Sequence, residues 1–298
     1  MPRDTPTPID AELLRSWPLP SEDGDKTERG TVLVVGGARQ TPGAVLLAAE
    51  SALRVGAGKV QVATASDTAA ALAVALPEAL VEGLPALRNG ELALAGADRV
   101  VEMAEHADVV LIGPGLSSPE CASLLVAQIV PRLDTSLVVD ALGTAYLTDH
   151  LDGVRHLAGR VLLTPNVSEA AAMLGRPEEE VEHDQLGAAR RLADATGAVV
   201  LSGGVVSYVV TPGDESWSHD AGHAGLATAG SGDVKAGAVA GLVARGALPE
   251  QAAAWGAWAH ASAGERLGRE VPGFLARDVL RAIPRELARV EGHRDASP

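Results

Sequence analysis

The sequence alternates short apolar runs with turns rich in glycine or proline and with helical segments along nearly its whole length. Strands are expected at residues 31–35, 59–64, 78–81, 108–112, 136–140, 161–164, 198–201, 205–211 and 215–219. Helices are expected at residues 44–54, 67–75, 97–105, 122–130, 145–151, 168–174, 185–196, 234–245, 249–267 and 275–286. Strands that alternate with helices form parallel sheets, so this order predicts a three-layer α/β/α fold with a doubly wound, mostly parallel central sheet.

Two details of the sheet are also predicted. Residues 205–211 alternate like an edge strand, and residues 215–219 are expected to return beside them as a hairpin across the turn at 212–214.

We expect one domain over residues 29–290, a partly flexible N-terminal extension at 1–28 and a tail at 291–298. Hydrophobic residues make up 47% of the 298 residues and aromatic residues only 2%, so the core must consist of Val, Leu, Ala and Ile. That composition favours a layered α/β fold over an aromatic-rich β-sandwich.

The net charge limits the partners. With a formal charge of −15 and no basic stripe, the chain is not expected to bind nucleic acid. A small nucleotide remains possible, because helix N-termini and Mg²⁺ can bind phosphate without a basic surface.

The single cysteine, Cys121, cannot form an internal disulfide, and no apolar run approaches the roughly 18 residues that span a bilayer. The first 20 residues do not have the pattern of a signal peptide, so we expect a cytoplasmic protein without a membrane partner.

The strongest functional motif is Gly230-Ser231-Gly232-Asp233, directly before the apolar segment 234–242. The glycines leave backbone N–H groups free to face one anion where the chain enters a helix. Asp233 could simply stabilise the positive end of the helix dipole. The pattern favours a second interpretation, a base beside an anion hole for phosphoryl transfer.

Five other special turns follow predicted strands: Gly36-Gly37, Gly113-Pro114-Gly115, Asp140, Thr164-Pro165-Asn166 and Gly203-Gly204. Ligands of open α/β sheets bind beyond the carboxyl ends of the strands. These turns and residues 230–233 are therefore expected to form one site at one edge of the sheet. Neither GxxxxGK[ST] nor GxGxxG is present, so the common nucleotide-binding motifs do not explain it.

Other candidate residues are more consistent with structural roles. His219 and His223 are four residues apart, but loop histidines are more often solvated than metal-bound, and no HExxH motif or cysteine cluster accompanies them. Trp255 and Trp258 lie on one helical face and are more typical of a core or a subunit interface than of cofactor stacking. Cys121 is expected to be a small buried or half-buried residue, since no activating basic partner is close in sequence.

The whole pattern resembles the ADP-dependent NAD(P)H-hydrate dehydratases of the ribokinase-like superfamily. The resemblance runs from about residue 29 to about residue 283 and is carried by Gly36-Gly37, Pro42-Gly43-Ala44, Gly56-Ala57-Gly58, Pro77-Glu78-Ala79, Gly113-Pro114-Gly115, Thr164-Pro165 with Glu169, and Gly230-Ser231-Gly232-Asp233. The last element also occurs in related small-molecule kinases. The early Pro42-Gly43-Ala44 and Ala57-Gly58 pattern is more particular to the dehydratases.

The resemblance implies a hydro-lyase that restores NADH or NADPH from its C6 hydrate and splits ADP, or ATP, with Mg²⁺. Asp233 matches the catalytic aspartate and would accept the proton of the C6 hydroxyl, while Gly230, Ser231 and Gly232 would stabilise the phosphoryl group. By position, the residues that match hydrate contacts are Ala44, Gly113, Gly115, Asn166 and Asp233, and those that match nucleotide contacts are Ser202, Gly203, Gly204, Val205, Val206 and Gly232. Members are often tetrameric, so a homo-oligomer is expected, with Trp255 and Trp258 as a possible contact.

Three positions depart from the commoner family pattern. Asn166 stands where His is usual, Ser202 stands where Lys is usual, and Asp140-Ala141-Leu142-Gly143 replaces a stretch like Asp-Ala-Asp-Ala-Leu. Losing a lysine beside a nucleotide removes a positive charge from its phosphates. Two alternatives therefore stay open: a small-molecule kinase similar to hydroxyethylthiazole kinase, and a nucleotide-binding protein with weakened catalysis.

Overall fold

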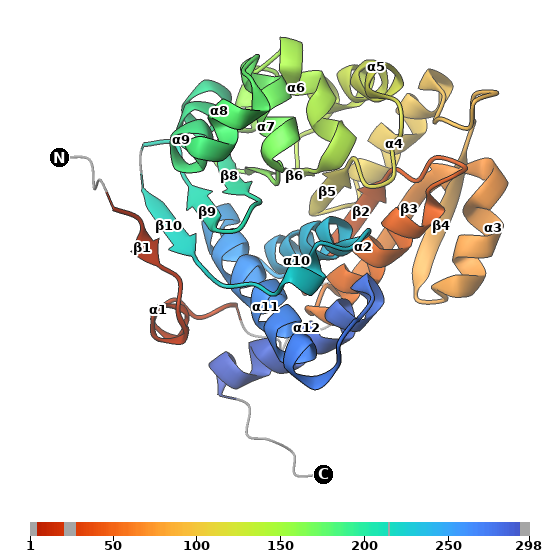
Figure 1. Cartoon of the computed structure of the whole chain (residues 1–298). Helices are drawn as coiled ribbons and strands as arrows, with labels where there is room; N and C mark the ends of the chain where they lie inside the picture. Colours follow the sequence, from red (N-terminus) through yellow and green to blue (C-terminus); the bar gives the residue numbers. More distant parts are fainter. Residues whose placement is uncertain (1–4, 21–27, 214, 293–298) are drawn as a thin grey trace.

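A ten-stranded sheet runs through the part of the chain that the computed structural model describes, residues 5–20, 28–213 and 215–292 (Figure 1). In chain order the strands are β1 (Thr7–Pro8), β2 (Thr31–Val35), β3 (Lys59–Ala65), β4 (Ala79–Leu84), β5 (Val109–Ile112), β6 (Ser136–Val139), β7 (Val161–Leu163), β8 (Val199–Ser202), β9 (Ser207–Val210) and β10 (Ser216–His219). Their order across the sheet is β1-β10-β9-β8-β7-β6-β5-β2-β3-β4. The run from β8 to β4 is parallel throughout, so the predicted, mostly parallel sheet is confirmed.

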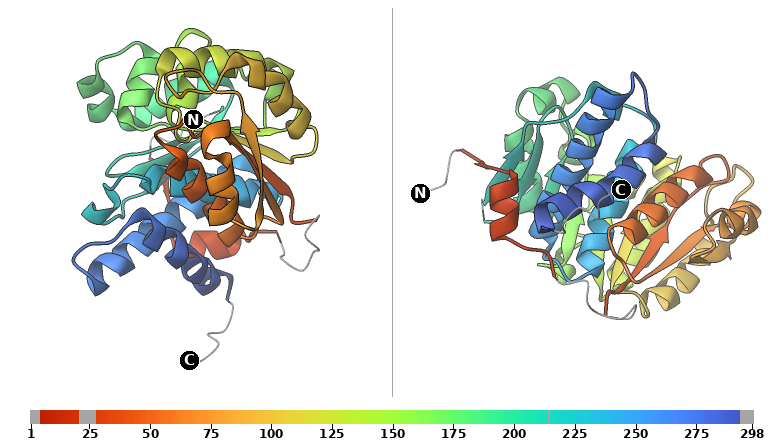
Figure 2. Two further views of the ribbon diagram at one scale, coloured as in Figure 1. Left: turned by 90° about the vertical axis from the view of Figure 1, so that its right-hand side faces the viewer. Right: turned by 90° about the horizontal axis from the view of Figure 1, so that it is seen from below.

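Helices cover both faces of this sheet (Figures 1 and 2). They are α1 (Ala11–Ser16), α2 (Pro42–Arg54), α3 (Ser66–Ala75), α4 (Ala97–Ala104), α5 (Pro119–Ile129), α6 (Ala145–Asp149), α7 (Val167–Leu174), α8 (Glu178–His183), α9 (Gln185–Thr196), α10 (Ser231–Ala244), α11 (Pro249–Glu270) and α12 (Ala276–Glu291). Alternate residues of β2 enter two separate cores: Val32 and Val34 belong to the core that also contains residues of α2, α10, α11 and α12, whereas Leu33 and Val35 belong to the core that also contains residues of α4, α5 and α9. This alternation is the period-2 pattern of a strand that is buried on both faces.

The chain changes direction across the sheet between β2 and β5. From β2 it continues outward to β3 and β4, and then it returns to β5 on the other side of β2 and proceeds to β6, β7 and β8. Such a reversal leaves a crevice beyond the carboxyl ends of the two central strands. The turns after β2 and β5 therefore lie side by side.

The predicted hairpin of β9 and β10 is present, but the predicted edge is wrong. β9 pairs with β8 on one side and β10 on the other, and β10 in turn pairs with β1. The alternation at 205–211 reflects antiparallel pairing rather than an edge, because β8 and β10 flank β9 on its two sides. The two-residue strand β1 from the far N-terminus lies at the edge, beyond β10. Of the turn predicted at 212–214, residue 214 lies outside the described residues.

The N-terminal segment packs onto the domain over residues 5–20. The side chain of Asp10 caps α1 by accepting hydrogen bonds from the backbone of Glu12 (2.9 Å) and Leu13 (2.8 Å). The ring of Trp17 stacks on that of Trp217, with centroids 5.5 Å apart. The division of the chain at residue 29 stays a prediction, but the sheet already begins at Thr7.

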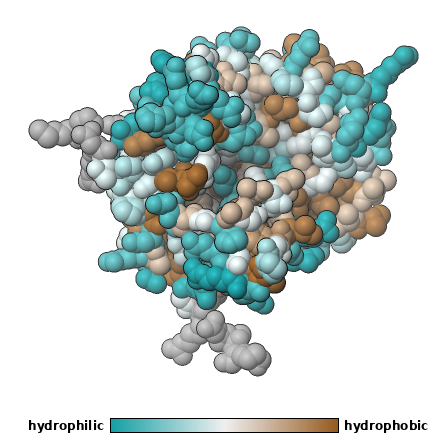
Figure 3. Space-filling view, viewed as in Figure 1, coloured by the Kyte–Doolittle hydropathy of each residue, from teal (hydrophilic) through white to brown (hydrophobic). Residues whose placement is uncertain are grey.

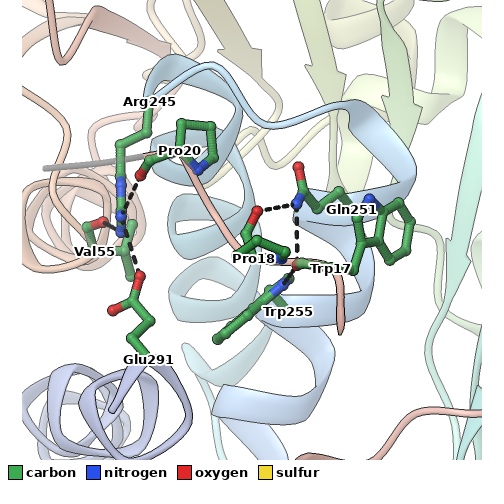
Figure 4. A network of polar contacts seen from close by, with 8 residues as sticks. All are labelled: Trp17, Pro18, Pro20, Val55, Arg245, Gln251, Trp255 and Glu291. Atoms are coloured by element: carbon green, nitrogen blue, oxygen red, sulfur yellow. Dashed lines mark hydrogen bonds and ion pairs between the residues drawn. The ribbon is translucent and has the colours of Figure 1, made fainter. Parts of the chain in front are cut away.

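Polar side chains of the C-terminal helices bind the backbone of this segment (Figure 4). Gln251 donates to the carbonyls of Trp17 (3.1 Å) and Pro18 (2.8 Å), and the indole nitrogen of Trp255 donates to Trp17 (2.9 Å). These bonds satisfy carbonyl groups in a segment that has little secondary structure of its own.

The same contacts correct the interface hypothesis for the two tryptophans. Trp255 is 0% exposed within a single chain, so its ring cannot contact another subunit. Trp258 is half-buried against the same core and remains the only one of the pair that a partner could reach. The homo-oligomer stays a prediction.

Candidate active site

The turns after β2 and β5 are joined by backbone hydrogen bonds at the point where the strand order reverses. The N–H of Gly37 donates to Pro114 (2.8 Å), and the N–H of Ala38 donates to Gly115 (2.8 Å). Gly115 has φ +70°, which disfavours any residue with a side chain, and a Cβ there would lie 3.0 Å from the Cβ of Ala44. The structure thus brings together Ala44 and Gly115, two residues predicted to contact the hydrate, with Gly113 at the base of the same turn.

Asp140 lies at the end of β6, next to the β5 turn. Its carboxylate accepts a hydrogen bond from the hydroxyl of Thr164 (2.6 Å), and its backbone carbonyl lies against Gly113. The side chain is buried, and burial raises the pKa of Asp140 to about 6 despite the opposing effects of Thr164 and Lys235. The ends of β6 and β7 thus hold together a buried carboxyl group, that of Asp140, and the hydroxyl of Thr164 that donates to it.

Asn166 and Glu169 form a capping box at the start of α7. The Asn166 side chain accepts from the backbone of Glu169 (2.9 Å), and the Glu169 carboxylate accepts from the backbone N–H (3.0 Å) and the amide (2.8 Å) of Asn166. Burial, together with the nearby charge of Asp140, raises the pKa of Glu169 to about 7. The amide of Asn166 is thus fixed by its own helix while the residue lines the adjacent cleft.

The motif at residues 230–233 starts α10 as predicted, three residues earlier than the expected helix. Gly230 is the N-cap, with φ +89°, and the first helical turn contains Ser231, Gly232 and Asp233. Burial, and after it the charges of Asp140 and Glu169, raise the pKa of Asp233 to about 7. A carboxylate with this pKa is well suited to accept a proton near neutral pH.

The hydroxyl of Ser231 lies 2.9 Å from Nε2 of His260 on α11, which also lies 3.1 Å from the carbonyl oxygen of Ser231. Burial lowers the pKa of His260 to about 3, and Lys235 contributes in the same direction. His260 is therefore neutral at physiological pH and holds the Ser231 side chain in one orientation. The sequence analysis missed this residue, because nothing within α11 marks it as facing the motif.

A cleft of about 930 Å³ opens between α7, the β8–β9 turn and the start of α10. Of the predicted nucleotide residues, Gly203, Gly204, Val205 and Gly232 line it, together with Asn166 and Ser231. Ser202 is buried just before this turn, and neither it nor Val206 is among the lining residues. Apolar residues form the far wall, namely Leu226, Ala257 and Ala261. The space-filling view from the side of Figure 1 shows a surface of mixed hydropathy that is hollowed near its centre (Figure 3).

The predicted site residues therefore fall into two neighbouring groups. Ala44, Gly113 and Gly115 gather at the crevice between β2 and β5, and the nucleotide candidates line the cleft beyond β8. Asp233 follows Gly232, which lines the cleft, and the charges of both Asp140 and Glu169 raise its pKa. This arrangement agrees with the prediction of one site at the carboxyl edge of the sheet.

Lys235 is a second residue that the sequence analysis missed. Its side chain lines the cleft, and it is the only charged residue between Asp233 and Arg245 in the sequence. A lone charge within an otherwise apolar helix was a signal that could have found it.

No group of three or more His, Cys, Asp or Glu side chains within the described residues could hold a metal ion. His219 accepts or donates at Ile9 (2.9 Å), and His223 accepts from the backbone of Gly225 (3.0 Å) and packs on Phe274. The expectation of solvated loop histidines is therefore wrong for His219, which is buried at the end of β10, whereas His223 lies exposed in a loop as expected. Cys121 is half-buried on α5, also as expected. Where the structure describes the chain, no helix is long and apolar enough to cross a membrane.

Comparisons with known proteins agree with this geometry. The NAD(P)H-hydrate dehydratase family matches residues 32–285. A protein of Xanthomonas campestris named ADP-dependent (S)-NAD(P)H-hydrate dehydratase is 41% identical over 286 residues, which cover 95% of this chain and 96% of the relative. The chain also matches several bifunctional NAD(P)H-hydrate repair enzymes and spans about half of their length.

Solved structures show the same similarity. The ADP/ATP-dependent NAD(P)H-hydrate dehydratase of Bacillus subtilis, co-crystallized with ATP/Mg²⁺, superposes with a TM-score of 0.76 at 25% identity, covering 97% of this chain and all of that one. A ribokinase-like superfamily protein of Enterococcus faecalis has a TM-score of 0.77 at 22% identity, covering 95% of this chain and 96% of that one. The second match shows the fold alone, and it confirms the ribokinase-like architecture.

Proposed function

The chain belongs to the NAD(P)H-hydrate dehydratase family, and we propose that it restores NADH or NADPH from the C6 hydrate by an ADP-dependent dehydration. The observation that carries this proposal is the position of Asp233. Its carboxyl group has a pKa of about 7. Asp233 stands in the first turn of α10, which starts at the edge of a cleft large enough for a nucleotide, and we place it between that cleft and the crevice at the strand reversal. A base that lies between two binding regions is what a transfer from nucleotide to hydroxyl requires.

In the first step, Asp233 accepts the proton of the C6 hydroxyl while that oxygen attacks the terminal phosphoryl group of ADP. The new phosphorus–oxygen bond forms as the bond to AMP breaks. The backbone N–H groups of Gly230 and Gly232, at the positive start of α10, would stabilise the charge on the transferred group. The N–H of Ser231, the third residue expected to contribute, donates to the carbonyl of Thr228 (3.2 Å) and would have to exchange that partner for the phosphoryl group. His260 holds the side chain of Ser231 in one orientation and so keeps this anion-binding helix start in place.

In the second step, the ring nitrogen expels phosphate from C6. Phosphate is a far better leaving group than hydroxide, which is why the first step is needed. Loss of a proton from C5 then re-forms the dihydronicotinamide ring. AMP and free phosphate are the other products, so the atoms of ADP and of the hydrate are all accounted for.

The two groups of residues suggest how the substrates are placed. We assign the hydrate to the crevice with Ala44, Gly113 and Gly115, and AMP to the cleft with Gly203, Gly204, Val205 and Gly232. Asn166 lines the cleft beside Gly203, so a contact with the hydrate, which the resemblance implies for it, would be made from the cleft side. Ser202 and Val206 belong to this assignment through the resemblance, because they flank the cleft-lining turn. The bare glycine turns allow the two ligands to approach the backbone closely.

Mg²⁺ belongs to the proposal only as an ion carried by the nucleotide. The carboxylates of Asp140, Glu169 and Asp233 do not form a group that could hold a metal by themselves. Mg²⁺ is commonly bound through substrate phosphates and water with few protein ligands, so such an ion would enter with ADP or ATP. Its role would be to neutralise phosphate charge.

The test is a repair assay on purified protein with NADH hydrate and either ADP or ATP. We expect the absorbance of the reduced nicotinamide to return, with one free phosphate released for each ring restored. A stable phosphorylated product without phosphate release would instead support the kinase alternative. Normal nucleotide binding without turnover would support a binding protein that has lost catalysis.

A further inference from the structure

We propose that Lys235 binds the phosphate groups of the nucleotide and thereby selects phosphorylated ligands over the nucleoside alone. This inference rests on the proposed function, since it concerns the same cleft. It assigns a role to a residue to which the resemblance gives none. The position of the ammonium group, its lack of a close protein partner and its separation from Asp233 each support it.

The ammonium group of Lys235 lies beside the turn that follows β8. A Cβ built on Gly203 would be 3.2 Å from Lys235 Nζ, so the absence of a side chain at Gly203 leaves room for the amine. The N–H of Gly203 donates to Pro165 (2.9 Å), which fixes the turn in this place. Lys235 thus presents its charge to the part of the cleft that Gly203, Gly204 and Gly232 line.

Among the described residues, no hydrogen bond or ion pair within 4 Å joins Lys235 to a side chain or carbonyl. The two carboxylates that raise its pKa, Asp140 and Glu169, act over a longer range and are hydrogen-bonded to Thr164 and Asn166. Burial lowers the pKa of Lys235 and is the largest influence on it. Lys235 is half-buried, and a partly desolvated cation without a close anion is unfavourable in the free protein, so an arriving phosphate gains more from it than from a solvated surface lysine.

The rest of the cleft offers no other strong cation. Lys235 is the one lysine or arginine among the described residues that line it, and the low pKa of His260 keeps that imidazole neutral. The chain as a whole carries a formal charge of −15. Polyphosphate binding in this surrounding therefore depends on the helix N-terminus and on Lys235.

Lys235 and Asp233 are two residues apart on α10, so their side chains leave the helix in different directions. The causes that raise the pKa of Asp233 are burial, Asp140 and Glu169, and Lys235 is not among them. An ammonium group against Asp233 would lower that pKa and weaken the base. The spacing lets one helical turn supply a base on one side and a phosphate-binding cation on the other.

The experiment measures binding rather than turnover, by isothermal titration calorimetry with ADP, AMP and adenosine. We expect Lys235→Met to weaken ADP binding by roughly 10- to 100-fold, which is the range for a hydrogen bond to a charged group. Adenosine should bind Lys235→Met and the wild type within about twofold, because it lacks the phosphates. Lys235→Arg should retain most of the ADP affinity, since it keeps the charge.

Lys59→Met is the matched control, because Lys59 begins β3 at the opposite, amino edge of the sheet. It should bind ADP as the wild type does. Circular dichroism and thermal unfolding check that each variant is folded, and Lys235→Gln replaces Lys235→Met if the latter does not fold. Equal ADP affinity in wild type and in a folded Lys235 variant would overturn the inference, as would a parallel loss of adenosine binding.

The outcome is separable from that of the proposed function. A wild-type protein that binds ADP through Lys235 but does not restore NADH from its hydrate would contradict the dehydratase activity and leave the inference standing. A wild-type protein that repairs the hydrate, with ADP affinity unchanged in Lys235→Met, would do the reverse.

Discussion

The two ends of α10 both place charged side chains in buried surroundings, but they treat those charges differently. At the C-terminal end, Arg245 donates to the carbonyls of Val55 (2.9 Å) and Pro20 (3.0 Å) and forms an ion pair with Glu291 (3.3 Å), as Figure 4 shows. At the N-terminal end, the pKa of Asp233 is raised and that of Lys235 is lowered by burial. The guanidinium at the first end has close partners within the protein, whereas the described residues give the side chains of Asp233 and Lys235 no hydrogen bond or ion pair.

Close packing keeps the two ends in a fixed relation. A Cβ at Gly237 or Gly241 would collide with the backbone of α2, and the hydroxyl of Ser51 on α2 donates to the carbonyl of Val234 (2.7 Å). A 14-residue helix is about 21 Å long, so the anchored end is remote from the chemistry. We infer that the contacts at the C-terminal end of α10 stabilise the fold, which lets the charged groups at its N-terminal end stay in an unfavourable environment until substrate binds.

The largest effect expected from this comparison is that of Asp233→Asn. The amide cannot accept the hydroxyl proton, so kcat should fall by about 10²- to 10⁴-fold in the repair assay. The same variant should unfold at an equal or higher temperature than the wild type at pH 8. A carboxyl group whose pKa is raised from 3.8 to about 7 contributes stability below pH 4 that is lost as the pH rises through 7.

The stability difference should therefore shrink when both proteins are compared at pH 5, where Asp233 is protonated in the folded state. Thermal unfolding at the two pH values measures it. Retained turnover would refute the role of Asp233 as the base, and a lower unfolding temperature at pH 8 would show that its charge is satisfied like that of Arg245.

Arg245→Met tests the other end of the helix. Removing the guanidinium leaves two carbonyls and Glu291 without their donor, so we expect a loss of about 3 kcal/mol in the free energy of unfolding, measured by urea denaturation. The ADP affinity of the folded protein should stay within about twofold. A large loss of ADP affinity with unchanged stability would contradict the division of roles between the two ends.

The pH dependence of kcat/KM should reflect the ionisable groups near the N-terminal end of α10 and not Arg245 at its C-terminal end. Below pH 7, kcat/KM should fall by up to about tenfold per pH unit, because Asp233 must be deprotonated. Asp140 and Glu169 titrate in the same range, with pKa values of about 6 and 7, so the apparent value belongs to the coupled set.

Glu169→Gln sharpens this prediction. Removing one like charge lowers the pKa of Asp233, so the acidic limb of the profile should move to lower pH, while Arg245→Met should leave it in place. A profile that is flat between pH 5.5 and 8 in the wild type would exclude Asp233 as the titrating base.

The smallest expected effect is a partial rescue. Ser202 immediately precedes the Gly203 turn that Lys235 faces, so a lysine introduced by Ser202→Lys brings a positive charge near the same phosphates. In the Lys235→Met background we expect this substitution to recover a few-fold of the lost ADP affinity, consistent with a partly solvated charge pair. Calorimetry of the single and double variants measures it, and a double variant no better than Lys235→Met would show that the two positions do not share a phosphate.

Much of the fold and part of the site could be predicted because their signals are local. The glycine turns, the capping pair of Asn166 and Glu169, and the helix start at 230–233 each depend on residues within a few positions of one another. In a parallel sheet, the turns that follow the strands all lie at the carboxyl edge, and the structure has the special turns at that edge.

What the sequence could not show depends on residues that are far apart in it. The hydrogen bond from Arg245 to Pro20 spans 225 residues, and that from Trp255 to Trp17 spans 238. The same holds for β1, which pairs with β10 at the end of the sheet, for His260, which orients Ser231, and for Lys235, whose ammonium group lies beside Gly203.

The sequence by itself determined the alternating elements, the doubly wound sheet and the edge at which the special turns lie, and it indicated Asp233 as the residue that we propose as the base. Tertiary structure alone decided which charged groups have close protein partners, as Arg245 has, and which lack them among the described residues, as do Asp233 and Lys235, the two that we propose to act on ligands. The physical reason is that periodicity and caps are properties of neighbouring residues, whereas the pKa and the partners of a charged group are set by everything that packs around it.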